Sequence, residues 1–112
     1  MRRIVLGLML VAGPALADDW RVLDGAAITG ALTSRVIAYD EEGPLQDFFA
    51  DGRTLKGEVL GRWKVEADRL CTQMPDRTDW TCVVVETEAR GLRLRFTGPD
   101  GVVLTGTYVD LN

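Results

Sequence analysis

Short segments of alternating polar and apolar residues run through most of this chain, and they constrain its fold more than any other feature. The segments from Arg62 to Ala67 and from Leu92 to Phe96 alternate almost without interruption. A two-residue period is typical of a β-strand with one buried face. An Asp-Gly pair at 51–52 and a Pro-Asp-Gly triplet at 99–101 are turn signals that join antiparallel strands. The pattern predicts about seven strands connected by short turns.

One segment near the start of these strands has helical rather than alternating periodicity. Ile28 and Leu32 are one helical turn apart, and Asp24 precedes them as a candidate N-cap. We therefore expect a mainly β domain: a small antiparallel meander, curled into a sheet or a lipocalin-like half barrel, with one short N-terminal helix.

Two local expectations accompany this fold. The polar start Asp18-Asp19-Trp20 is expected to fray. The segment from Thr54 to Leu60 is expected to be one strand, interrupted by Gly57 and closed by Gly61.

The first 17 residues have the features of a secretory signal peptide. Two arginines precede an apolar run at 4–11, and an Ala-Leu-Ala cleavage signal occupies 15–17. The run is shorter than the roughly 20 residues of a membrane span. Residues 18–112 then form a single domain with 17 acidic and 11 basic side chains, a net charge of −6. This size and charge argue against a second domain, a Rossmann or barrel enzyme of ordinary size, and a general nucleic-acid binder.

Cys71 and Cys82 are the chain's two cysteines. In an exported protein such a pair indicates a disulfide, here across the polar loop between two strands. The alternative, a redox or metal pair, lacks both the C-x-x-C spacing and a histidine.

Three aromatic residues are candidates for ligand binding at a barrel mouth: Trp63, Trp80 and Tyr108. Exposed tryptophans stack on sugars and flat rings, whereas buried ones would pack beside the disulfide. Both interpretations remain open for these positions.

Four basic residues alternate with core positions and form a candidate basic face: Arg62, Lys64, Arg93 and Arg95. If their strands are close together, this face could meet an anionic envelope component or a partner protein. Glutamates on neighbouring segments offer the alternative of an ordinary charged sheet surface.

The chain contains no histidine, which excludes the Ser-His-Asp and Cys-His arrangements. It has no glycine-rich nucleotide-binding motif, so we expect no cofactor. The acidic run at 40–42 lacks the spacing of a calcium loop, so we expect no metal site. Paired carboxylates of a small hydrolase remain possible.

Three short motifs follow one another along the chain: G-x-W-x-V at 61–65, D-x-L-C at 68–71 and W-x-C at 80–82. Together with A-D-G-R-T at 50–54 and the strand at 101–108, they resemble a pattern in small exported alphaproteobacterial proteins of unknown function. These include the group catalogued as domain of unknown function 995. The resemblance covers roughly residues 25–108. It implies a periplasmic β domain with a hairpin disulfide and no established activity.

We therefore expect a small periplasmic or secreted protein that acts as a non-catalytic binding or accessory module. Its partner would be an envelope protein or a small ligand, with no nucleic acid and no stable membrane insertion. The alternative is a small hydrolase built on carboxylates.

Overall fold

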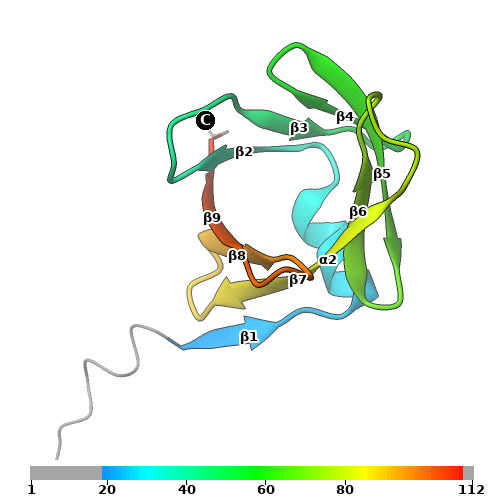
Figure 1. Ribbon diagram of the computed structural model, residues 1–112. Coiled ribbons are helices and arrows are strands. Elements are labelled where there is room, and N and C mark those ends of the chain that lie inside the picture. Colours follow the sequence, from blue (N-terminus) through cyan, green and yellow to red (C-terminus); the bar gives the residue numbers. More distant parts are fainter. Residues whose placement is uncertain (1–18, 110–112) are drawn as a thin grey trace, which may run out of the picture.

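The computed structural model describes residues 19–109, which form nine strands and one helix (Figure 1). The predicted signal peptide at 1–17 lies outside the described residues. The elements are, in chain order, β1 (Trp20–Val22), α2 (Gly25–Leu32), β2 (Arg35–Tyr39), β3 (Gln46–Phe48), β4 (Arg53–Lys56), β5 (Val59–Glu66), β6 (Arg69–Gln73), β7 (Thr81–Glu88), β8 (Arg93–Thr97) and β9 (Val103–Tyr108).

Eight of these strands close into an antiparallel barrel. The order around it is β7-β6-β5-β4-β3-β2-β9-β8, and β8 pairs back with β7. Closure leaves these strands without a long free edge, which a curled open sheet would expose. The predicted mainly β meander with one short N-terminal helix is therefore confirmed, and its sheet curls all the way into a closed barrel.

The ninth strand, β1, is added to β7 outside the barrel. Its pairing joins Trp20 to Glu88, while β6 pairs with the earlier part of β7, where Cys82 lies opposite Cys71. The expectation of a frayed start is therefore wrong for Trp20, which begins β1, whereas Asp18 lies outside the described residues. β1 is ordered because it continues the edge of β7 beyond the point where β6 ends.

Helix α2 lies within the outline of the barrel strands in Figure 1 and contacts β5, β6 and β2. The Asp24 side chain caps its first turn by accepting a hydrogen bond from the amide of Ala27, as predicted. Ile28 and Leu32 are fully buried on its inner face. The Tyr108 hydroxyl donates to the carbonyl of Ala31 at 2.8 Å and connects the end of the helix to β9.

The barrel interior is filled by side chains. Its buried core combines the two helix residues with strand residues that alternate inward: Ile28, Leu32, Ile37, Phe48, Trp63, Leu70, Val85, Leu94 and Phe96. An eight-stranded barrel is just wide enough for side chains to fill it. Helix α2 contributes Ile28 and Leu32 to this packing.

The expectation for residues 54–60 is wrong. Instead of one interrupted strand, Gly57 adopts a φ of 64° in a turn between β4 and β5. Gly61 does not close a strand but lies inside β5 and is buried. A glycine inside an alternating pattern can mark either a turn or a close backbone approach. Gly57 is in a turn, and Gly61 is at a close approach.

Candidate functional site

A groove on the outer surface of the barrel brings three arginines together. We call it the arginine groove; it has a volume of about 620 Å³ and is lined by Arg53, Arg62 and Arg77, by Leu60, Met74 and Pro75, and by Gly61, Gln73 and Thr78. Its residues come from β4, β5, the end of β6 and the loop that follows β6, which Figure 1 places beside these strands.

Strand register builds one wall of this groove. Arg53 of β4 lies opposite Arg62 of β5, and Arg62 lies opposite Gln73 of β6. The row faces outward because Trp63, the next residue along β5, points into the core. Arg62 Nη2 donates to Gln73 Oε1 at 3.0 Å, which fixes the guanidinium beside a neutral amide.

The loop after β6 forms the opposite wall. The amide of Arg77 donates to the carbonyl of Met74 at 3.0 Å, and Gln73 Nε2 donates to the carbonyl of Thr78 at 2.8 Å. These two bonds fold the loop back on itself. The fold-back brings Arg77 to the groove that Arg62 lines from the sheet.

Gly61 is required where the loop passes over β5. A Cβ atom at this position would lie 2.7 Å from the carbonyl oxygen of Gln73 and 2.7 Å from the sulfur of Met74. Both distances are far shorter than ordinary van der Waals contact, so a side chain here would displace the loop. The glycine therefore allows Met74 to lie directly against the strand.

The charge of the groove is positive in an otherwise acidic protein. None of its lining residues is Asp or Glu. Arg53 forms an ion pair with Asp51 at 2.8 Å, whereas within residues 19–109 no acidic side chain forms an ion pair with Arg62 or Arg77. Two of the three guanidinium groups are therefore available to an anion.

A second cavity adjoins the groove at the rim of the barrel. We call it the rim cavity; its volume is about 500 Å³ and it is lined by Pro44, Lys56, Val59, Met74, Pro75 and Asp76. Met74 and Pro75 line both cavities and form the ridge between them.

The three aromatic residues proposed from the sequence do not meet at one barrel mouth. Trp63 is buried, packs edge-on against Phe48 and donates from Nε1 to the carbonyl of Phe49 at 2.9 Å. The Tyr108 ring lies under the guanidinium of Arg35, 3.8 Å from its Cζ atom. These positions are occupied by contacts within the protein.

Trp80 lies outside the barrel wall, on the opposite side of β5 from Trp63. The Nζ of Lys64 is 4.3 Å from the centre of its ring, and the Cζ of Arg62 is 5.5 Å from it. Cation–π contacts of this kind stabilise the position of the cation. Trp80 therefore supports Arg62 at the edge of the arginine groove.

The four basic residues proposed as one face form two separate groups. Arg62 and Lys64 are on β5, whereas Arg93 and Arg95 are on β8, and β6 and β7 lie between these strands. Arg93 pairs with Asp40, and Arg95 pairs with a glutamate of β7 in a hydrogen bond that raises the pKa of Arg95. The β5 group contributes Arg62 to the groove.

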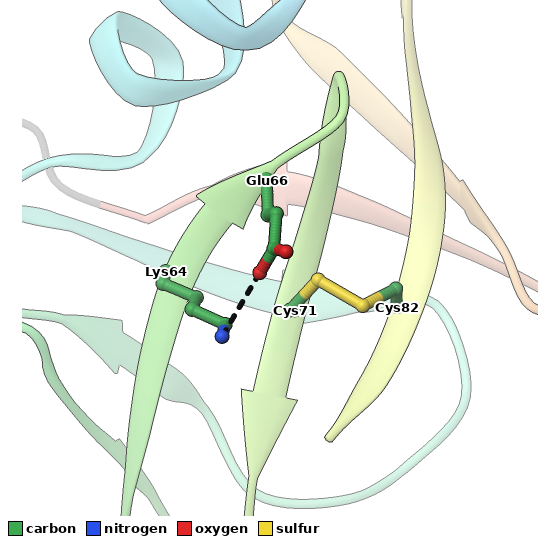
Figure 2. The surroundings of a disulfide bond; sticks show 4 residues. All are labelled: Lys64, Glu66, Cys71 and Cys82. Carbon is green, nitrogen blue, oxygen red and sulfur yellow. Dashed lines mark ion pairs between the residues drawn. A yellow bond between two sulfur atoms is a disulfide. The ribbon is translucent and has the colours of Figure 1, made fainter.

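Cys71 and Cys82 form a disulfide between β6 and β7, as the sequence predicts (Figure 2). The two residues are directly opposite each other in the ladder, with their Cα atoms 4.0 Å apart. Figure 2 also shows the ion pair of Lys64 and Glu66 on neighbouring β5, with an N–O distance of 2.9 Å. The disulfide joins the two strands that carry the groove loop.

The carboxylates needed by the hydrolase alternative are absent from the groove lining. Glu41 and Glu42 line a smaller cavity of about 110 Å³ beside Tyr39 and Lys56. Within residues 19–109, no group of three or more His, Cys, Asp or Glu side chains is arranged to hold a metal ion.

Comparisons with protein-family models, with curated proteins and with solved structures find no match to this chain. Among the described residues, no helix has the length and apolar character needed to cross a membrane.

Sequence reasoning identified Arg62 but missed Arg53 and Arg77. Arg53 follows an Asp-Gly turn and Arg77 lies in a polar loop, so neither belongs to an alternating strand with an obvious outer face. The available signal was the length of the loop between the two cysteines, which is long enough to fold back over the neighbouring strand β5.

Proposed function

We propose that this protein is a non-catalytic binding module that holds an anionic ligand in the arginine groove. One observation carries the proposal: three arginines and an apolar wall line one groove that contains no carboxylate. A guanidinium offers a rigid fork of donors that matches carboxylate and phosphate groups, and two of these forks have no acidic partner within residues 19–109.

The size of the groove supports a small ligand. Its volume of about 620 Å³ falls within the range of small-molecule sites, about 300–1,000 Å³. Because the groove is open to solvent, each charge contact is screened, and we expect moderate affinity for a simple anion.

We further propose that the protein works outside the cytoplasm, in the periplasm or as a secreted protein. The disulfide and the signal-like segment at 1–17 support this location, because disulfides persist in oxidising compartments. The resemblance to exported proteins of unknown function is consistent with it and stays a prediction.

The test is a titration of the oxidised protein with inorganic phosphate and with acetate, followed by backbone amide NMR. We expect shifts concentrated at residues 60–62 and 73–78, since these segments line the groove. Arg62→Gln and Arg77→Gln should each weaken binding about fivefold, in line with the loss of about 1 kcal/mol from one solvent-exposed ion pair.

Arg90→Gln provides the matched control. Arg90 is exposed in the turn between β7 and β8, outside the groove lining, so its loss changes the net charge equally without removing a contact. Equal weakening by all three variants would mean that only net charge matters. That result, or shifts scattered over the whole surface, would contradict the proposal.

A further inference from the structure

The arginine groove and the rim cavity are two parts of one surface. Both are lined by Met74 and Pro75. The first two residues of β5 face them separately, because Val59 lines the rim cavity and Leu60 lines the groove. A molecule that lies across the Met74–Pro75 ridge would therefore contact both cavities at once.

The two cavities differ in chemistry. The groove presents three arginines and no acid, whereas four of the six residues around the rim cavity are apolar: Pro44, Val59, Met74 and Pro75. The remaining two, Lys56 and Asp76, have opposite charges. Lys56 also places its amine over the ring of Tyr39, 5.3 Å from the ring centre. An anionic group is therefore favoured in the groove and an apolar group in the rim cavity.

We propose that the ligand is a single-chain amphiphile, whose anionic head binds the arginine groove and whose hydrocarbon chain crosses the Met74–Pro75 ridge into the rim cavity. This inference rests on the proposed anion-binding function and names the class of ligand. Carboxylate and phosphate heads share the required charge. Methionine supports such a site because its flexible thioether adapts to the shape of a chain.

The chain should contribute strongly to affinity. A fully buried methylene tightens binding about fourfold, from a transfer free energy of about 0.8 kcal/mol. The rim cavity is open, so only part of a chain is removed from water. We expect octanoate, with six methylenes more than acetate, to bind at least about tenfold more tightly than acetate.

The experiment compares three probes on the full oxidised domain by calorimetry and amide NMR. Acetate supplies the charge alone, octanamide supplies the chain alone, and octanoate supplies both. Octanoate should bind most tightly, at least about fivefold more tightly than octanamide. It should shift the amides of Lys56 and Val59, which line the rim cavity and not the groove, in addition to those of the groove.

Val59→Ser tests the chain subsite directly. Val59 is 47% exposed, so the change leaves the core intact. We expect octanoate to bind about threefold more weakly and acetate to bind unchanged. Val22→Ser is the matched control, because Val22 is 65% exposed on β1 and lines neither cavity. It should leave both affinities unchanged.

The possible outcomes distinguish failure of the amphiphile proposal from failure of the proposed anion-binding function. Equal affinities for acetate and octanoate, with shifts confined to the groove, would overturn the amphiphile and leave anion binding intact. Equal affinities for octanamide and octanoate would overturn the role of the arginines as the head-group site. Absence of response to phosphate, acetate and octanoate alike would defeat the proposed function itself.

A membrane surface is the competing source of the same chemistry. Co-sedimentation with vesicles that contain an anionic phospholipid distinguishes the two. Vesicle binding without any response to dissolved octanoate would assign the surface to a bilayer and overturn the single-chain ligand.

Discussion

Removing the Cys71–Cys82 disulfide should cost a large part of the stability of this domain. The bond closes a loop with a sequence separation of 11. For a loop of that length, the chain-entropy relation gives about 3 kcal/mol at 25 °C, through restriction of the unfolded chain. A small domain has a free energy of unfolding of about 5–15 kcal/mol in total. The variant C71A/C82A should therefore be folded but markedly weakened.

Urea unfolding at pH 7 measures this loss. With a slope of about 1–3 kcal/mol/M, the midpoint should fall by about 1–3 M. The slope itself should rise in the variant, because an unfolded chain without the cross-link exposes more surface. Wild-type protein reduced with a phosphine serves as the control and should unfold at the midpoint of the double variant.

The native hairpin gives a second readout. Leu70 pairs with Val83, and Thr72 pairs with Thr81, on either side of the two cysteines. These pairs should hold the strands in register without the bond, so the order of amide protection within β6 and β7 should be retained. A double variant within about 0.5 kcal/mol of oxidised wild type would refute the loop-closure reasoning. Selective loss of protection in this hairpin would refute the claim that the effect is exerted mainly on the unfolded chain.

Two further substitutions test the packing inside the barrel by urea unfolding. The Tyr39 hydroxyl donates to Gln46 Oε1 at 2.6 Å, so Tyr39→Phe should cost about 1–3 kcal/mol by leaving a buried amide oxygen unpaired. Burial raises the pKa of Tyr39 above its usual value, so the stability that Tyr39 contributes is fully present below about pH 10 and decreases at higher pH. An equally steep alkaline loss of stability in Tyr39→Phe would contradict this account. A Cβ at Gly106 would lie 2.5 Å from Cγ2 of Ile37, so Gly106→Ala should cost about 1–3 kcal/mol by overpacking. Gly30→Ala is its control, because a Cβ at helix position 30 would meet open space. This variant should leave the stability of the protein unchanged or raise it by up to about 1 kcal/mol. Equal losses of stability in both variants would refute the steric account.

The sequence predicted the fold well where one strand face is buried and the other is wet. The alternation from Arg62 to Glu66 became the outward and inward faces of β5, whereas Ala67, expected to continue the strand, lies in the turn after it with a φ of 53°. The Asp24 cap began the helix at the expected place. The prediction was wrong at Gly57 and at the start of the chain. A three-residue strand such as β1 carries too little alternation to be recognised, and its order comes from pairing with a distant strand.

The site was harder to predict because it depends on register. Arg53 and Arg62 lie on different strands, so no pattern within a single strand relates them. They are neighbours because the β4–β5 turn sets a register in which they are directly opposite each other. The separation of Trp63 from Trp80 was accessible in principle. Trp80 precedes Cys82 by two residues, so in an extended chain both side chains lie on the same, outer side of the sheet. The alternation of β5 instead directs Trp63 inward.

The charge of the whole domain also shapes how an anion would reach the groove. Residues 18–112 carry a net charge of −6, so a distant anion is repelled, whereas one within the groove is attracted by the arginines. Added salt screens both effects, because the Debye length falls to about 8 Å at physiological ionic strength. Weaker repulsion by the net charge raises phosphate affinity, and weaker attraction by the arginines lowers it. Phosphate affinity should therefore fall only about twofold to threefold between 0.02 and 0.15 M salt. Phosphate titrations at both ionic strengths measure this. A steep loss, tenfold or more, would mean that long-range attraction dominates, contrary to a site that acts through short contacts with Arg62 and Arg77.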